Sequence, residues 1–350
     1  MNKYRESYHA LSYTAEQKAE IARQAAAAAQ TSMKKTHRKI NAVAKIAAIA
    51  ACLVSVLTIS AEAAGIPTPV SEILAPIFGG TVAQTDVIDK IGRPIDASDT
   101  DNGITISADA IIGDEYNATI VFTIRRDDGT PLLPEEVSEK SLIVGGDNDI
   151  SMIKNGGAHG SARFKDTTPG DSEIQYLYHI SSDVPLNKGT CKVSFKDIMY
   201  MNPDTESTEP ILKGNWKFRF EIDYEDSSLV LGNGETFQQS GMNFTIAEVR
   251  LSPAAFRVSY EVDSEVQWSD APNGRLPEED RRQMERYLEN IQVLLTKKDG
   301  SVINLSYSGG SIRPENGRTY CTKSEVLEEI IPLEEVESIQ VGSIIYPVHS

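Results

Sequence analysis

The sequence predicts a mainly β protein in which two tandem β-sandwich domains follow one membrane-spanning helix and a short helical segment. Three observations support this prediction. Beyond residue 103, apolar and polar residues alternate in many short segments rich in Val, Ile, Phe and Tyr, which is typical of antiparallel strands. Two stretches of that region look like copies of each other. Nearer the N-terminus, one uncharged run has the character of a membrane helix.

The uncharged run comprises the sixteen residues Ile46–Ala61. At 1.5 Å per residue it reaches roughly 24 Å, short of a hydrocarbon core of about 30 Å, so Lys45 and Glu62 must snorkel toward the interfaces. Residues 42–66 are therefore the predicted transmembrane helix, an uncleaved signal anchor. Two alternatives stay open: a cleaved signal peptide, because Ala61-Glu62-Ala63 has the small-x-small form of a cleavage site, and a buried helix of a soluble protein.

Charge predicts the orientation of this helix. Residues 1–45 contain nine Lys and Arg against three Asp and Glu, whereas the rest of the chain has 25 against 48. Cytoplasmic flanks carry the positive charge, so we expect a cytoplasmic N-terminus and an extracytoplasmic C-terminal body at the cell membrane. An acidic body repels nucleic acid, and the basic flank can contact anionic lipid. That flank comprises Lys34, Lys35, Arg38, Lys39 and Lys45.

Residues 1–41 form the predicted cytoplasmic segment. Thr14-x-x-Gln17 has the form of a capping box and opens an alanine-rich stretch of strong helix formers. Large apolar residues are too few here for an independent core, so the helix is either a solvated stalk or a segment that orders on a partner. In the second case it docks in a groove of the partner through Tyr8, Leu11, Tyr13 and Ile21.

Residues 67–102 are predicted to be a linker with one short helix, which Ser71 can cap and Gly79 ends. The rest of the linker is polar and turn-rich, and its acidic run faintly resembles a calcium-binding loop. The glycine arrives one position early, however, and position twelve is Ala110, where an EF-hand needs a carboxylate. We therefore expect a solvated acidic linker. The run comprises Asp96, Asp99 and Asp101.

Two pairs of segments in the C-terminal body match in pattern. A strand, a turn and a strand begin at Gly103 and again at Gly241, and a proline-leucine pair precedes both the segment ending at Tyr200 and the segment ending at Tyr346. A duplicated β-sandwich explains both matches. Each copy has a normal size for one core. The two predicted domains are residues 103–228 and 229–350.

The second copy contains an inserted helix. Pro277 and the acidic residues after it favour a helix with proline at its first position and carboxylates in its first turn. The helix leads into two strand-like segments joined by Asp299-Gly300, which is a strong hairpin signal.

The chain contains no recognisable catalytic, cofactor or metal motif, so the sequence predicts neither an enzyme nor a cofactor or metal site. His179 lies in a strand-like segment and is expected on a sheet face. His159 and Ser161 stand two residues apart in a glycine-rich stretch predicted to be a flexible loop, and without a third group they form no triad. Whether Cys191 and Cys321 pair stays open.

The inside segment LSYTAEQKAEIARQ, the basic run KKTHRK, one membrane span and the stretch FGG…IGRPIDASDTDNGITISADAIIGDEYNATIVFTI together resemble a bacterial domain-of-unknown-function family, numbered four-one-seven-nine. The resemblance is clearest over residues 11–130, and the C-terminal copy looks like the immunoglobulin-like domain that often follows. It implies two immunoglobulin-like sandwiches outside a Gram-positive cell membrane. It also implies an anti-sigma factor, a negative regulator that holds an extracytoplasmic-function sigma factor at the membrane.

In that scheme an extracytoplasmic ligand or protein of unknown identity acts on the sandwiches and weakens the hold on the sigma factor. The chain has no cysteine before Cys52, so it lacks the zinc spacing of zinc-binding anti-sigma domains, and any restraint must come from a short helical segment without metal. The alternative is a surface-anchored binding or structural module whose inside tail has no signalling role.

Overall fold

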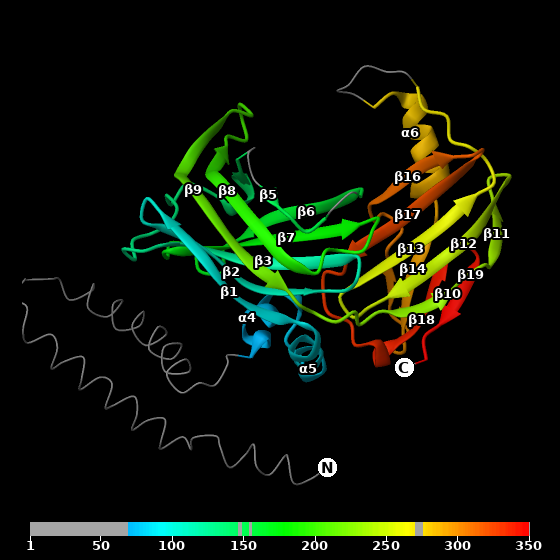
Figure 1. Cartoon of the computed structure of the whole chain (residues 1–350), viewed down its shortest axis with the longest axis horizontal. Coiled ribbons are helices and arrows are strands. Elements are labelled where there is room, and N and C mark those ends of the chain that lie inside the picture. The colour runs from blue at the N-terminus through cyan, green and yellow to red at the C-terminus, as the bar shows by residue number, and fades with distance from the viewer. Residues whose placement is uncertain (1–68, 146–148, 154–155, 270–275, 350) are drawn as a thin grey trace, which may run out of the picture. The chain divides into compact units, whose positions relative to one another are not determined.

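The computed structural model describes residues 69–145, 149–153, 156–269 and 276–349, and these form a mainly β protein with several antiparallel sheets (Figure 1). The predicted cytoplasmic segment, transmembrane helix and basic flank lie outside the described residues. Those predictions therefore stay predictions, as do the proposed partner-binding residues Tyr8, Leu11, Tyr13 and Ile21.

Two helices open the described chain. α4 (Val70–Phe78) begins after Pro69 without a side-chain cap, so the expected capping by Ser71 is wrong. Ser71 instead donates from its backbone N–H and its hydroxyl to the carboxylate of Asp89 on the next helix, at 2.8 and 2.9 Å. That helix, α5 (Val82–Ile91), begins with a capping box between Thr81 and Gln84, which satisfies backbone donors of the first turn.

The first β unit, residues 93–224, consists of two sheets around one core. One sheet has the order β1-β2-β3-β7-β6, and in the other β8 pairs with β4, β5 and β9. The first sheet comprises β1 (Arg93–Asp101), β2 (Ile104–Gly113), β3 (Asn117–Arg126), β6 (Ala158–Lys165) and β7 (Glu173–Ser182). The second comprises β4 (Leu142–Val144), β5 (Asp149–Ile150), β8 (Gly189–Met201) and β9 (Thr208–Ile222), with a 3-10 turn, η1, at Glu139–Ser141.

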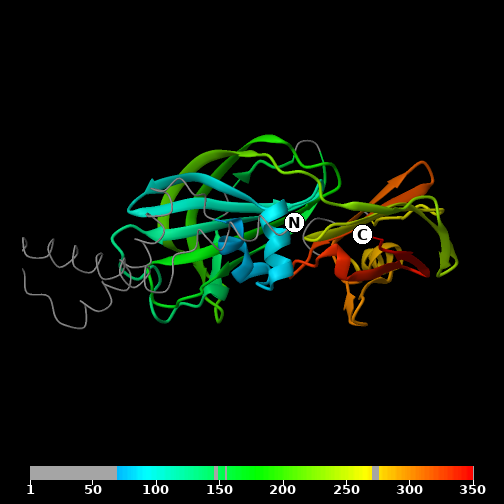
Figure 2. The ribbon, with the colours of Figure 1, turned by 90° about the horizontal axis from the view of Figure 1, so that it is seen from below.

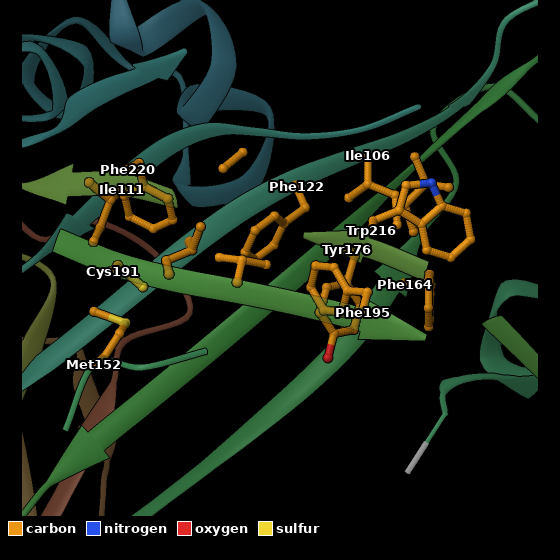
Figure 3. Packing of buried hydrophobic residues seen from close by; sticks show 14 of the residues in the cluster. Ile106, Ile111, Phe122, Met152, Phe164, Tyr176, Cys191, Phe195, Trp216 and Phe220 are labelled. Atoms are coloured by element: carbon orange, nitrogen blue, oxygen red, sulfur yellow. The ribbon is translucent and has the colours of Figure 1, made fainter. Parts of the chain in front are cut away.

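Aromatic side chains from both sheets meet in this core (Figure 3). Phe122 of β3 packs edge-to-face against Phe195 of β8, with ring centroids 5.2 Å apart. Trp216 of β9 is fully buried and donates from Nε1 to the Ile104 carbonyl at 2.8 Å. The indole thus fills the core without leaving its polar group unpaired. The first sheet and the second are therefore two layers of one folded unit.

The expected acidic linker is wrong for residues 93–101, because they form the strand β1. Asp99 and Asp101 accept the backbone N–H groups of Lys217 and Asn215 on β9, at 2.7 and 2.9 Å. These two donors lie on the side of β9 that does not face β8, so the carboxylates satisfy an otherwise open strand edge. The acidic residues close one corner of the first β unit.

The second β unit, residues 229–348, also has two sheets. One has the order β10-β12-β13-β17-β16 with β11 also paired to β12, and the other has the order β15-β14-β18-β19. The first sheet comprises β10 (Leu229–Gly232), β11 (Thr236–Gln239), β12 (Met242–Leu251), β13 (Ala255–Val262), β16 (Gly310–Glu315) and β17 (Arg318–Val326). The second comprises β14 (Val293–Lys297), β15 (Val302–Asn304), β18 (Val336–Val341) and β19 (Ile344–Pro347), with a 3-10 turn, η3, at Leu333–Glu335.

The inserted helix of this unit is confirmed. α6 (Glu278–Met284) follows Pro277 and continues into a π-helical turn, η2 (Glu285–Glu289). Beneath it Lys323 of β17 is fully buried and donates from Nζ to the carbonyls of Leu288 and Ser306, at 2.8 and 2.5 Å. Burial lowers the pKa of Lys323 to about 8. The ammonium ties the end of the inserted helix to the sheet.

The strand order recurs between the two units. β2, β3, β7 and β6 follow one another in the first sheet as β12, β13, β17 and β16 do in the second unit. In each unit, a further sheet is built around a late strand, β8 or β18, which pairs with an earlier strand and with the strand that follows it. This recurrence agrees with the match between the segments that begin at Gly103 and Gly241.

The second sequence match is wrong at its end. In the first unit β8 runs on to Met201 through a bulge at Asp197, which has a φ of 46°. In the second unit the chain turns at Gly342, which has a φ of 57°, and Tyr346 lies on a separate strand, β19. One copy bends where the other reverses direction, so Tyr200 and Tyr346 occupy different strands.

Candidate functional site

The two helices lie where the two β units meet (Figures 1 and 2). Their apolar faces pack on the outer face of the first sheet and on the buried residues Ala254 and Ile330 of the second unit, beside the partly buried Val326. Burying one cluster of side chains from three parts of the chain joins those parts together. The cluster comprises Val70, Leu74, Ile77, Phe78, Ile88 and Ile91 from the helices, Ala110, Ile112, Val121 and Leu177 from the sheet, and Ala254 and Ile330 from the second unit.

Two hydrogen bonds fasten the helices to the second unit. The Ile330 N–H donates to the carbonyl of Phe78, the last residue of α4, at 2.8 Å. Gln84 of α5 donates from Nε2 to the Ile330 carbonyl at 3.0 Å. Both backbone groups of a buried residue are thereby satisfied by the helices. The segment that directly follows the predicted membrane span is thus bound to both β units.

A buried carboxylate ties the two units at their turns. Asp114, in the turn between β2 and β3, accepts the Ser252 hydroxyl of the β12–β13 turn on Oδ2 at 2.7 Å. Its Oδ1 accepts the N–H groups of Tyr116 and Asn117 and the Asn117 amide, each at 2.9 Å. Burial raises the pKa of Asp114, while these four bonds favour the ionised form. The carboxylate is fully partnered, as a buried charge requires.

Beside this tie, two arginines of the second unit hold Tyr116 of the first. The guanidinium carbons of Arg257 and Arg250 lie 4.1 and 5.2 Å from the centre of the Tyr116 ring, within the range of cation–π attraction. Arg250 forms ion pairs with Glu115 of the first unit at 2.9 Å and with Glu248 of its own unit at 2.8 Å. Positively and negatively charged side chains thus alternate across the junction between the two units.

A pocket of about 350 Å³ opens next to the helices. Its walls come from α4, from β6 and β7 of the first unit, and from the end of β17 and the loop before β16 in the second. It is therefore formed only when the three parts are together. The lining residues that carry polar or aromatic groups are Phe78, His159, Ser161, Arg163, His179, Ser181, Glu325 and Glu328.

The expectation of a flexible loop at His159 and Ser161 is wrong, because both lie on β6. His159 donates from Nε2 to the Ser324 carbonyl of the second unit at 2.9 Å. Ser161 is the cross-strand partner of His179 on β7, and His179 lies on a sheet face as expected. Its Nδ1 shares a 2.7 Å hydrogen bond with the Thr119 hydroxyl. Burial lowers the pKa of His179 to about 4.

Two histidines and a serine thus meet in one pocket, although neither histidine forms a hydrogen bond with Ser161 in the part of the chain that the structure describes. Over the same residues, no three His, Cys, Asp or Glu side chains gather as a metal site would require. Cys191 and Cys321 are both buried and unpaired, one in the core of each unit. The described helices are too short or too polar to cross a bilayer.

The residues of the junction were not singled out from the sequence. Asp114 and Tyr116 lie in the turn of the segment that begins at Gly103, and Ser252 lies in the matching turn of the segment that begins at Gly241. The matching turns were the available signal, because two equivalent turns can meet when copies pack end to end. Nothing in the local sequence pairs residues that stand 138 positions apart.

Comparison with known proteins adds a distant structural likeness. No protein-family model and no curated protein matches the chain. Among solved structures, the chain is similar to one described as the crystal structure of the conserved domain protein from Bacillus anthracis, with 12% sequence identity, a TM-score of 0.47, and coverage of 76% of this chain and 82% of that chain.

Proposed function

We propose that the chain is a single-pass membrane protein that acts as an anti-sigma factor, with residues 69–350 outside the cell and the N-terminal segment in the cytoplasm. The observation that carries the proposal is the anchoring of α4 and α5 on both β units. A change in how the units meet must move or release these helices, and they directly follow the predicted membrane span. The junction therefore supplies a route from an outside event to the inside segment.

Membership in the resembled bacterial family, with two immunoglobulin-like sandwiches, is part of the same proposal. The recurrence of the order β2-β3-β7-β6 as β12-β13-β17-β16, together with the sequence match between the segments that begin at Gly103 and Gly241, supports a duplicated sandwich. Each unit encloses a core between its two sheets, which is the construction of a sandwich.

A pull-down tests the proposal. Full-length protein in detergent micelles should capture an extracytoplasmic-function sigma factor from cells of its own source. Leu11→Asp and Ile21→Asp should abolish the capture, because each places a charge on the predicted docking face. Ala19→Asp adds the same charge to the same segment, but two positions from Ile21 and therefore on the other side of the predicted helix, and it should leave the capture unchanged. Absence of a sigma factor among the captured proteins contradicts the proposal.

The pocket between the units favours a second candidate, a surface-anchored binding module whose inside tail is inert. That function needs the pocket but not the N-terminal segment. Deletion of residues 1–30 separates this alternative from the regulator. If ligand binding at the cell surface is retained and transcription from sigma-factor-dependent promoters is unchanged, the result supports the binding module.

A further inference from the structure

The pocket at the junction has a polar floor that follows one strand. His159, Ser161 and Arg163 stand at alternate positions of β6 and all line the pocket, as expected for side chains on one face of a strand. Their neighbours on β7 include His179 and Ser181. On the same face of the sheet, α4 and α5 cover Leu177 of β7, and Lys165 of β6 donates to the Pro76 carbonyl of α4. The pocket lies over the part of β6 and β7 that carries His159, Ser161 and His179.

Charge is separated along this floor. The Ser324 carbonyl accepts a hydrogen bond from His159, and Glu325 directly follows Ser324. The carboxylates of Glu325 and Glu328 therefore lie at the end of the pocket that His159 lines. The α-carbon of Arg163 lies four residues further along β6 than that of His159, about 13 Å away at roughly 3.3 Å per residue. Its charge acts on His179 and helps to keep that ring neutral. One end of the pocket is anionic and the other is cationic.

His179 adds a neutral group between the two ends. Its Nδ1 bonds to the fully buried Thr119, and with Thr119 as the donor the ring carries its proton on Nε2. Among the described residues, none forms a hydrogen bond with Nε2 of His179. Because His179 lines the pocket, this N–H can donate to a ligand there. Phe78 completes the wall and contacts the His179 ring edge-to-face, with centroids 6.4 Å apart.

We propose that this pocket binds a short peptide with free ends, whose carboxylate pairs with Arg163 and whose ammonium group pairs with Glu325. An extended peptide of three residues spans at most about 10 Å, which leaves room for one hydrogen bond at each end. Two carboxylates against one guanidinium disfavour a phosphate ligand. The pocket volume of about 350 Å³ suits a small ligand.

A peptide seated here contacts α4 at Phe78 and both β units at once. Binding therefore favours the arrangement in which the three parts are together, because the pocket exists only in that arrangement. The role of the peptide as the stimulus of the regulator depends on the function proposed above, whereas the binding itself does not.

Calorimetric titration of full-length protein in detergent micelles tests the site with three probes: trialanine, N-acetyl-trialanine and trialanine amide. We expect trialanine to bind, and each capped peptide to bind at least about tenfold more weakly because it lacks one charge-assisted pair. The proposal is overturned if no heat of binding is observed up to about 10 mM trialanine, because a Kd above that concentration is too weak for a specific site. Equal affinity for all three peptides also overturns it.

Two variants assign the ends of the peptide. Arg163→Gln should remove the discrimination against trialanine amide, and Glu325→Gln should remove the discrimination against N-acetyl-trialanine. Matched controls on exposed residues elsewhere in the second unit, Arg313→Gln and Glu337→Gln, should bind trialanine as the wild type does. The opposite assignment, in which Arg163→Gln affects only the N-acetyl discrimination, contradicts the proposed orientation.

The peptide titration and the pull-down fail independently. Peptide binding without sigma-factor capture contradicts only the proposed function. Sigma-factor capture by a protein that does not bind trialanine contradicts only the peptide site.

Discussion

At the scale of single residues, Asp114 is the buried carboxylate of the junction. It satisfies four donors, one of them from the other β unit. Asp114→Ala leaves those donors buried and unpaired, and we expect it to lower the free energy of unfolding by about 3 kcal/mol, since each unsatisfied buried group costs ~1–3 kcal/mol. Urea denaturation of residues 69–350 measures the loss.

Asp128→Ala is the matched control for Asp114. Asp128 also accepts two hydrogen bonds, from the Thr130 N–H and hydroxyl, but it is fully exposed in a turn. Water replaces the lost partners there, so we expect a change within about 0.5 kcal/mol. Equal losses from the two substitutions contradict the role assigned to burial of Asp114.

His179 predicts a pH dependence of stability. Burial lowers its pKa from 6.5 to about 4, so between these pH values the unfolded chain binds a proton that the folded chain excludes. Protonation of the unfolded state lowers stability as the pH falls through this window, with a limiting slope of about 1.4 kcal/mol per pH unit. His179→Gln removes this contribution, and its denaturation curves at pH 7, 6, 5 and 4.5 should show a shallower decline. Parallel declines in the two proteins contradict the prediction.

The sequence indicated His179 on a sheet face but placed His159 in a loop. The misleading signal was glycine. Gly160 lies inside β6, where a Cβ atom would stand 2.2 Å from the His179 carbonyl, so the residue is needed for the close approach of two strands. Glycine marks both turns and such approaches, and local sequence does not separate the two.

At the scale of elements, β1 makes a testable contribution. The carboxylates of Asp99 and Asp101 accept backbone N–H groups of β9. We expect Asp99→Ala with Asp101→Ala to speed hydrogen exchange at the amides of Lys217 and Asn215 by at least about tenfold, because a bond to a charged acceptor is worth ~1.5–3 kcal/mol. Exchange is read by NMR or by mass spectrometry of peptides.

Asp96→Ala provides the control for β1. Asp96 lies on the same strand with its side chain exposed, and its replacement should leave exchange in β9 unchanged. If all three alanine substitutions leave β9 equally protected, the carboxylates do not close the corner.

The helix α4 is expected to be stabilised by its buried face rather than by its caps, since no side chain caps its start. Leu74 is fully buried against the sheet, and Leu74→Ala should cost about 3 kcal/mol of the free energy of unfolding. Val82→Ala, at a side chain that is 77% exposed, should cost less than about 0.5 kcal/mol. Comparable losses from both substitutions contradict the packing of the helix on the sheet.

Elements with strong local signals were predictable. The hairpin at Asp299-Gly300 and the helix after Pro277 formed where the turn and charge signals indicated. The strand β1 was missed because its alternation pairs Asp, Ser and Thr with few apolar residues, so it reads as a polar turn. Its strand character depends on β2 and β9, which a local pattern does not contain.

At the scale of the molecule, alternation along the strands predicted a mainly β protein, and the duplication predicted two similar halves. The junction between the halves was not predictable. Asp114 meets Ser252, and Gln84 meets Ile330, across 138 and 246 positions. Such contacts follow from how finished units pack, and a single sequence carries no periodic signal for them.

The central claim is that the helices and the two β units form one cooperative body. The chain has two tryptophans, Trp216 in the first unit and Trp268 in the second, so Trp268→Phe leaves fluorescence that reports the first unit alone. In urea denaturation of this variant, the account predicts that Trp216 fluorescence and far-ultraviolet circular dichroism share one midpoint. Two separate transitions, with Trp216 fluorescence following only one of them, would contradict it.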